Sequence, residues 1–280
     1  MAGPSWRIAA RLGRRPLAWL GLAGLLAIAA VALAAPWLYP GDPLDMAGQP
    51  RLWPGADPDF PLGTDGLGRD MAAGLAYGAR ISLLVGFCAM LATLAIGVAI
   101  GAAAGYLGGT VDTLLMRFTE VFQTIPNFLL IVVLVLVLQP SLATIIGAIA
   151  TVSWPGLARL MRAEVLSLRE RDFVQSCRTV GMSDLRIVMT QILPNCLSPV
   201  LVTGSILTAS AILIEAGLAF LGLGDPNVVS WGSMIGAGRP VLRTAWYICA
   251  IPGVAIILTV LSLNLLAEGL NDALNPRGRE

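Results

Sequence analysis

The chain has 280 residues, of which 56% are apolar and only 12% are charged, about half the charged fraction of a soluble domain. Its net charge of +1 offers no electrostatic argument for binding nucleic acid. It contains no histidine, and its four cysteines lie singly, which argues against a zinc, haem or iron–sulfur centre built by this chain alone.

Membrane-spanning helices are expected wherever 18 or more residues carry no charge, and several such stretches predict an all-α polytopic membrane protein. The first is residues 16–38. Arginines precede it, but it is too long for a signal-peptide core, so residues 1–15 are interpreted as a tail and 16–38 as a retained helix. After a loop at 39–79, a second helix is predicted over 81–106. Within it Gly97, Gly101 and Gly105 form a small-residue stripe suited to close helix packing.

The longest charge-free stretch, residues 121–158, exceeds what one helix needs to cross a hydrocarbon core of about 30 Å. Gln139-Pro140-Ser141 interrupts it, and proline ends a helix and favours a turn. We therefore predict a hairpin of two helices, 116–138 and 141–158. Two further spans, 198–222 and 245–267, bring the predicted number of membrane helices to six.

Arginine placement predicts the topology, because cytoplasmic segments retain basic residues. The tail 1–15, the loop 159–190 and the tail 271–280 are rich in arginine, and six crossings place all three on one side. Both termini are therefore predicted to be cytoplasmic. The loop 39–79, with six aspartates against two arginines, and the loop 223–244 are then external.

The polar loop 159–195 contains the sequence DFVQSCRTVGMSDLRIVMTQILPN at residues 172–195. Asp172 is predicted to cap a short helix with an apolar face made of Phe173, Val174, Cys177 and Val180. Gly181 stands where a left-handed residue ends a helix, Ser183 can cap a second helix with Asp184 in its first turn, and Pro194 ends or kinks that helix. The pattern predicts a helix–turn–helix at the membrane surface. A docking element for a cytoplasmic protein and an interfacial helix without a partner both fit it.

This segment resembles the cytoplasmic loop motif of ATP-binding-cassette (ABC) importer permeases, which reads EAA, then a glycine, then a hydrophobic stretch ending in LP. Gly181 and Leu193-Pro194 match its spacing, whereas Gln175-Ser176-Cys177 stand where the family has Glu-Ala-Ala. The family's glutamate commonly contacts the ATPase, so the neutral amide of Gln175 would take that place. The resemblance implies an ATPase-coupling surface made of Asp172, Gln175, Ser176, Arg178, Gly181, Asp184, Leu193 and Pro194.

A second motif, FPLGTDGLGRD at residues 60–70, precedes the second span. Taken by itself it is a turn-rich loop in which Asp65, Arg69 and Asp70 could form an ion-pair cluster. It closely resembles the HPLGTDxLGRD signature of the second permease subunit of dipeptide, oligopeptide and nickel importers, with Phe60 in place of histidine. Its motif residues here are Gly63, Thr64, Asp65, Gly68, Arg69 and Asp70. The stretches EAGLAFLGLG at 215–224, WGSMI at 231–235 and NLLAEGLNDALNPR at 264–277 resemble the same family, so the resemblance spans about residues 10–280.

The resemblance implies the type I ABC importer permease fold in the cell inner membrane, with residues 80–270 forming a five-helix transmembrane domain. It implies a homologous permease as heterodimer partner, two ABC ATPase subunits that bind ATP and Mg, and an external substrate-binding protein. The chain is then not an enzyme and holds no cofactor itself, and it has no GxxxxGK[ST] phosphate loop. The implied cargo is di- or oligopeptides, with nickel, a metal chelate or a glutathione-type molecule as the alternative.

Polar residues within the spans are candidates for the translocation pathway or a subunit interface. Glu215 lies late in the fifth span, where an acid is costly and usually functional, although local pairing or packing against the partner subunit also accounts for it. Glu120, Gln123 and Asn127 in the third span and Asn264 in the sixth fit pore lining and interhelical hydrogen bonding equally well. An ion-coupled secondary transporter would need inverted repeats and more intramembrane ionisable residues. A membrane-embedded enzyme would need clustered acids or histidines at one depth, and the sequence offers none.

Overall fold

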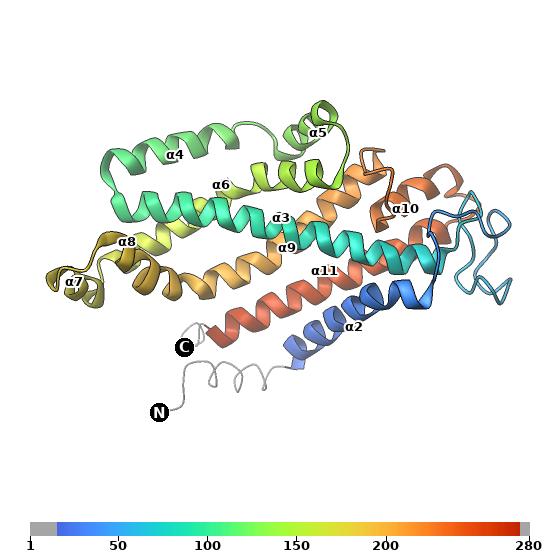
Figure 1. Ribbon diagram of the computed structural model, residues 1–280, viewed down its shortest axis with the longest axis horizontal. Helices are drawn as coiled ribbons and strands as arrows, with labels where there is room; N and C mark the ends of the chain where they lie inside the picture. Colours follow the sequence, from blue (N-terminus) through green and yellow to red (C-terminus); the bar gives the residue numbers. More distant parts are fainter. Residues whose placement is uncertain (1–15, 275–280) are drawn as a thin grey trace.

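The structure, a computed structural model, describes residues 16–274. The arginines of the tail 1–15 and the end of the C-terminal motif, with Arg277 and Arg279, lie outside the described residues. The described chain is helical apart from its loops and one isolated bridge between Thr64 and Asp70. Its α-helices in chain order (Figure 1) are α2 (Pro16–Leu38), α3 (Met71–Leu107), α4 (Gly109–Gln123), α5 (Asn127–Leu138), α6 (Leu142–Arg169), α7 (Asp172–Thr179), α8 (Asp184–Ile187), α9 (Leu197–Phe220), α10 (Trp231–Gly238) and α11 (Tyr247–Leu274).

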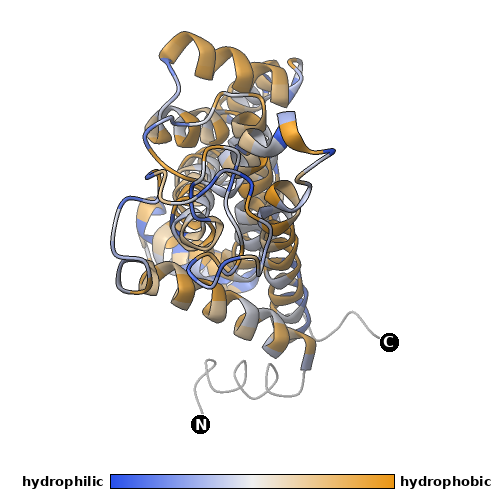
Figure 2. Ribbon diagram, turned by 90° about the vertical axis from the view of Figure 1, so that its right-hand side faces the viewer, coloured by the Kyte–Doolittle hydropathy of each residue, from blue (hydrophilic) through white to orange (hydrophobic). Residues whose placement is uncertain are grey.

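The long helices run side by side along the long axis of the molecule, with α7 and α8 at one end and the loop between α2 and α3 at the other (Figure 1). Five helices are long and apolar enough to cross a membrane, and the bent pair α4–α5 makes a sixth if it counts as one span. Figure 2 shows apolar helices behind a front of hydrophilic loops. The predicted all-α membrane fold is thereby confirmed, and the six predicted spans are reached when α4 and α5 are counted as one.

Helix α3 lies at the centre and packs against α6, α9 and α2. The predicted small-residue stripe explains its closest approach, because a Cβ atom built on Gly101 would lie 2.4 Å from the Ala158 carbonyl oxygen of α6. Gly97 and Gly105 meet Leu157 and Val165 of the same helix in the same way. The prediction of close helix packing at these three glycines is therefore confirmed.

The first span packs against the last. A Cβ atom on Gly21 of α2 would lie 2.6 Å from the Ser262 carbonyl oxygen, and one on Gly269 of α11 would lie 2.3 Å from the Ala18 side chain. Small residues on both helices let the backbones approach closely, as in other membrane helix pairs.

Several predicted helix boundaries are wrong in the same direction. Helix α3 begins at Met71 rather than at Ile81, because the Asp70 carboxylate accepts a hydrogen bond from the Ala72 N–H at 2.8 Å and caps the helix there. Helix α6 continues to Arg169 instead of ending at 158, and α11 continues to Leu274 instead of 267. A charge ends the apolar stretch but not the helix, since a helix that leaves the bilayer can continue in water.

The predicted single helix over 116–138 is also wrong. Helices α4 and α5 meet at 81°, at a break over residues 124–126. Pro126, which has no N–H group, stands immediately before α5. The one break that was predicted here, at Gln139-Pro140-Ser141, is confirmed, and the Ser141 hydroxyl caps α6 by accepting from the Thr144 N–H.

Candidate coupling and transport sites

The cytoplasmic segment forms the predicted pair of short helices, α7 and α8. Gly181 has φ of +81°, and its N–H donates to the Arg178 carbonyl at 2.9 Å while the Met182 N–H donates to the Cys177 carbonyl at 3.1 Å. These two bonds define a Schellman motif, which satisfies the last carbonyls of α7 and fixes the turn. The prediction that Gly181 supplies a left-handed turn is confirmed.

Two details of this segment differ from prediction, and a third decides between two alternatives. Asp172 is the first residue of α7 and Arg171 is its N-cap, without a side-chain capping bond. Ser183 is the N-cap of α8 as predicted, but its hydroxyl makes no capping bond either. Of the two alternatives for Pro194, ending or kinking the helix, the first is excluded, because helical backbone continues from Asp184 to Phe220 through a π turn at Val188–Ile192 and a 3-10 turn at Leu193–Cys196.

The predicted apolar face of α7 is only partly buried. Val174 is fully buried, whereas Val180 is 85% exposed. On the next helix Ile187 is buried and Leu185 is 74% exposed. Val174 and Ile187 pack in a core with Tyr106, Met161 and other side chains of α3 and α6. The segment is therefore attached to the ends of two spans, and it presents Val180 and Leu185 outward.

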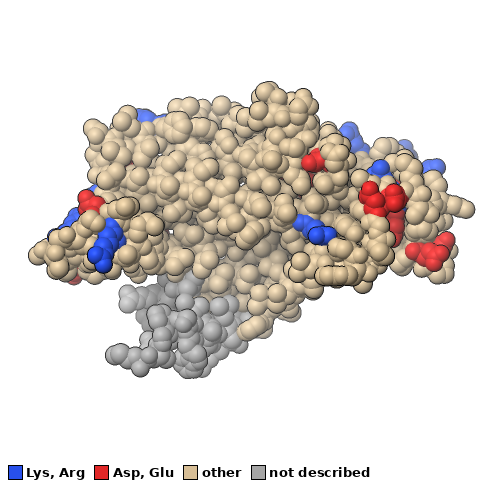
Figure 3. Space-filling view, viewed as in Figure 1, with Lys and Arg blue, Asp and Glu red and all other residues tan. Residues whose placement is uncertain are grey.

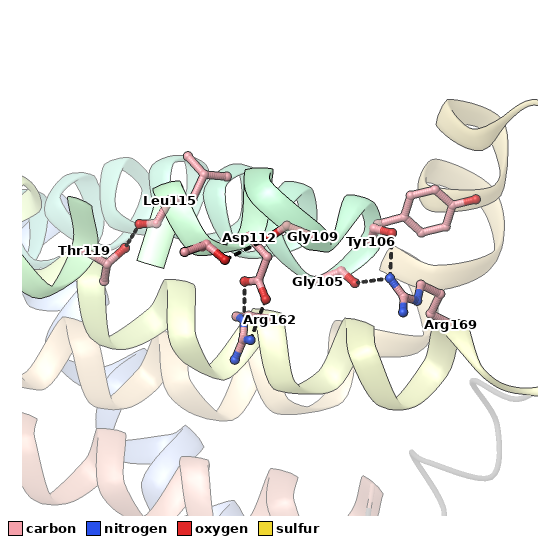
Figure 4. Close-up of polar contacts among 9 residues, drawn as sticks. Gly105, Tyr106, Gly109, Asp112, Leu115, Thr119, Arg162 and Arg169 are labelled. Atoms are coloured by element: carbon pink, nitrogen blue, oxygen red, sulfur yellow. Dashed lines mark hydrogen bonds and ion pairs between the residues drawn. The ribbon is translucent and has the colours of Figure 1, made fainter. Parts of the chain in front are cut away.

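Tyr106, at the end of α3, holds both short helices. Its hydroxyl donates to an Asp184 carboxylate oxygen at 2.6 Å, and the Arg178 guanidinium lies over its ring at 5.2 Å. Arg169 of α6 donates to the Tyr106 carbonyl at 3.1 Å (Figure 4). Sequence reasoning missed this residue, although a tyrosine at the end of a long apolar run was a signal for it.

A second connection joins α6 to α4. Arg162 donates from Nε to Asp112 Oδ1 at 2.5 Å and from Nη2 to Asp112 Oδ2 at 2.6 Å (Figure 4). Two parallel bonds of this kind fix the relative orientation of both groups. The pair therefore holds the inner ends of α6 and α4 together.

The residues of the predicted coupling surface lie together at this end of the molecule. Gln175 donates to the Arg169 carbonyl at 3.3 Å, and the Ser176 hydroxyl donates to the Asp172 carbonyl at 2.9 Å, so both side chains fold back onto the chain. Charged side chains gather at the two ends of the face in Figure 3, while most of its middle is uncharged. Leu193 is half-buried, and the exposed residues of the surface are Asp172, Gln175, Ser176, Arg178, Gly181, Asp184 and Pro194.

The external motif folds back onto the starts of α3 and α11. Thr64 is fully buried; its hydroxyl donates to the Gln49 carbonyl and accepts from the Leu52 N–H. The Tyr247 hydroxyl at the start of α11 shares its one proton between two carbonyl oxygens, that of Leu52 at 2.7 Å and that of Thr64 at 2.9 Å. Gly63 has φ of +76°, and a Cβ atom there would lie 2.3 Å from the Leu52 oxygen. Sequence reasoning also missed Tyr247.

The predicted ion-pair cluster in this motif is wrong. Within residues 16–274, Asp65, Arg69 and Asp70 make no ion pair with one another. Asp65 accepts instead from the N–H groups of Leu67 and Arg69, at 2.8 and 2.9 Å, and Asp70 caps α3. Gly68 has φ of +86° and lies against the Gly48 carbonyl. Short aspartates in a turn satisfy backbone donors more readily than they pair with a long side chain.

Glu215 lies on α9 and is 2% exposed. Its Oε1 accepts from the Ser230 hydroxyl at 2.6 Å, and Ser230 in turn forms a capping box with Ser233 at the start of α10. Glu215 Oε2 has no hydrogen-bond partner among the described residues. The local pairing considered from the sequence is thus present, and it connects α10 to α9.

The other polar span residues do not form one face. Glu120 forms an exposed ion pair with Arg117 on α4, at 2.9 Å. Gln123 ends α4 and Asn127 begins α5, on the two sides of the break, and both are exposed. Asn264 is exposed on α11.

Comparison with known proteins assigns the family. Residues 97–280 match the family described as binding-protein-dependent transport system inner membrane component, and residues 4–54 match the N-terminal transmembrane domain of oligopeptide transport permease C. The chain is 40% identical to the di/tripeptide transport system permease protein of Pseudomonas aeruginosa, over 92% of this chain and 87% of that protein. It is 38% identical to the dipeptide transport system permease protein of Bacillus subtilis, over 98% of this chain and 85% of that protein.

A solved structure carries the same fold. A chain of a methionine ABC transporter in an inward-facing conformation aligns with a TM-score of 0.59 at 16% identity, covering 72% of this chain and 96% of that one. Helices of this length and hydropathy are those of a multi-pass inner-membrane protein. The chain belongs to the inner-membrane permease components of binding-protein-dependent ABC importers.

Proposed function

We propose that this chain is the permease subunit of an ATP-driven importer of di- and oligopeptides. The observation that carries the proposal is identity of about 40%, over more than four fifths of both chains, to permeases named for dipeptide and di/tripeptide transport. A homologous permease completes the pathway as heterodimer partner, and an external binding protein delivers the peptide.

ATP hydrolysis belongs to two partner ATPase subunits, which bind ATP and Mg, so this chain acts without a cofactor of its own and is not an enzyme. Its part is mechanical. The ATPases contact the exposed face of α7 and α8, where Val180 and Leu185 supply apolar contact among polar neighbours. Apolar residues within a polar rim are the usual composition of a protein interface.

Movement of that face reaches the spans through the contacts described above. Tyr106 joins the coupling segment to α3, Val174 and Ile187 join it to α6, and the Asp112–Arg162 pair carries the displacement to α4. A rigid turn at Gly181 makes α7 and α8 move as one body. Alternation between inward-open and outward-open states is then a rigid-body change of packed helices.

The test is uptake of a labelled dipeptide by a strain deleted for this gene and by the same strain carrying it on a plasmid. Uptake that disappears on deletion and returns on complementation supports the proposed cargo. Uptake that stays unchanged in a strain without a second peptide importer contradicts it, and accumulation of nickel, metal chelate or glutathione then becomes the measurement.

A further inference from the structure

The break between α4 and α5 lies at the depth of the hydrocarbon core. Helix α6 runs antiparallel beside α4 and also packs against α5, and its outer end is marked by the Leu142 N–H, which donates to Asp225 of an external loop. Trp154 follows Leu142 by 12 residues (154 − 142), about 18 Å along the helix, and the first charge, Arg159, lies about 8 Å further. Phe118 stacks on Trp154 with ring centroids 5.8 Å apart, and Phe122 meets Trp154 edge to face at 5.3 Å.

Because α4 runs outward, the break over 124–126 comes about one turn beyond Phe122. It therefore lies close to the midpoint between the two ends of the apolar part of α6. The residues after it return to α6, since Ile131 and Val135 of α5 are buried in the same core as Ile145 and Ile149. The segments on both sides of the break thus pack against α6, and the break is not a loop at the surface of the membrane.

The break is exposed, and polar side chains stand at it within an apolar surrounding. Residues 123–127 are all exposed: Gln123, Thr124 and Asn127 are polar, Ile125 (43% exposed) and Pro126 are apolar, and Asn127 begins α5 without a capping side chain before it. The rest of α5 is entirely apolar, and its outer face is exposed at Val133 (54%) and Val137 (72%). Polar groups concentrate at the one place where the helix is interrupted.

Contact between lipid and the α4–α5 break would cost free energy. A helix end leaves carbonyl and N–H groups without intrahelical partners, and each such group costs several kcal/mol in hydrocarbon. Non-helical backbone at this depth is tolerated where it is buried in protein or lines a water-filled cavity. Side-chain amides at both edges of the break favour water, because they keep hydrogen-bonding groups that a dry contact would leave unpaired.

We propose that the α4–α5 break faces the aqueous translocation pathway and that Gln123 and Asn127 bind the backbone of the passing peptide. The peptide part rests on the proposed function. A carboxamide donates and accepts hydrogen bonds without carrying charge, as the peptide group does. Two carboxamides beside free helix-end groups therefore bind any peptide through its backbone and do not select its side chains.

The experiment uses the assembled importer in lipid nanodiscs, where both membrane faces meet the solvent. Cys88, Cys177, Cys196 and Cys249 are first replaced by alanine, and single cysteines are then placed by Gln123→Cys and Asn127→Cys. Val133→Cys and Val137→Cys are matched controls, exposed on the same span but away from the break. Reaction with a charged methanethiosulfonate requires water and a thiolate. We expect the two break cysteines to react at least tenfold faster than the two controls, and a saturating dipeptide to slow them severalfold.

The outcomes separate the two parts of the proposal. Break cysteines as slow as the controls would overturn the aqueous position and indicate packing against the partner permease. Fast labelling that a transported dipeptide does not slow would overturn the backbone contact. Dipeptide uptake by the cysteine-free parent is measured in parallel. If that uptake is absent, both the proposed cargo and the proposed peptide contact are contradicted. The labelling rates then still show whether the break is exposed to water.

Discussion

The two ends of this permease carry one family motif each, and the motifs are built in opposite ways. At the outer end, residues 60–70 pack against the rest of the protein. Thr64 is buried, and a Cβ atom built on Gly63 would lie 2.3 Å from the Leu52 carbonyl oxygen. At the inner end, Gly181 has the same left-handed backbone but no atom within 4 Å of its ideal Cβ, and its neighbours point outward. A glycine with positive φ therefore allows close packing in the outer motif, whereas in the inner motif it forms a turn on an exposed surface.

The largest expected effect comes from Gly63→Ala in the outer motif. The new methyl group combines a disfavoured positive φ with a backbone clash, so we expect a loss of about 3 kcal/mol or more and little assembled importer in the membrane. The yield and thermal stability of the purified complex measure this. Gly55→Ala is the control in the same loop, because Gly55 also has positive φ but meets nothing within 4 Å. Equal losses in both variants would show that close packing is not what the motif provides.

The next effect concerns the inner motif. Gly181→Val strains the Schellman turn without a clash, so the complex should assemble while dipeptide uptake falls about tenfold and ATP hydrolysis persists. Uptake and ATPase activity are measured on the same proteoliposomes. Gly222→Val, at an equally open left-handed position at the other end, should leave uptake within about twofold. Normal uptake by the Gly181 variant would contradict a coupling role for the turn.

Smaller losses of stability are expected when a tyrosine hydroxyl is removed at either end. Tyr247→Phe removes the one O–H donor that the Leu52 and Thr64 carbonyls share at the outer end, and because the site is buried we expect a loss of about 2 kcal/mol. Tyr106→Phe removes one bond to the exposed Asp184 and keeps the ring under Arg178, so the loss should be about 1 kcal/mol. Hydrogen–deuterium exchange should rise in residues 48–64 for the first variant and in α8 for the second. Exchange that rises at both ends in either variant would mean that the two ends are not independent.

The smallest effect is expected for Glu215→Gln. The amide oxygen of glutamine can still accept from Ser230, so assembly and uptake should stay within about twofold of the parent. Glu215→Leu removes the acceptor and should lower the thermal stability of the complex. If the glutamine variant assembles normally but does not transport, the carboxyl group has a role in transport beyond holding α10.

Much of the fold could be predicted from the sequence, because charge-free length and arginine placement reflect the bilayer directly. Proline positions were less informative. Pro140 and Pro126 both stand at breaks, whereas Pro155 and Pro252 lie inside α6 and α11. Every proline removes one backbone N–H group and so one helical hydrogen bond. Whether the helix ends there depends on the packing of the surrounding helices. A single sequence does not reveal that packing.

The candidate sites divide in the same manner. Gly181 was predictable because its conformation is local and encoded by the residues beside it. The contacts of Tyr106 with Asp184 and of Asp112 with Arg162 join residues 78 and 50 positions apart, so periodicity could not reveal them. The ion-pair cluster expected in the outer motif failed for a related reason: nearness in sequence does not decide between a backbone partner and a side-chain partner.

The packing of α2 against α11 has a consequence for biosynthesis. The first described span carries glycines that fit against the last described span, so this contact can form only after α11 has been synthesised. A chain that stops before α11 leaves that glycine surface uncovered. The same contact that closes the finished bundle thus distinguishes complete chains from truncated ones, and gives membrane proteases a physical basis for removing the latter.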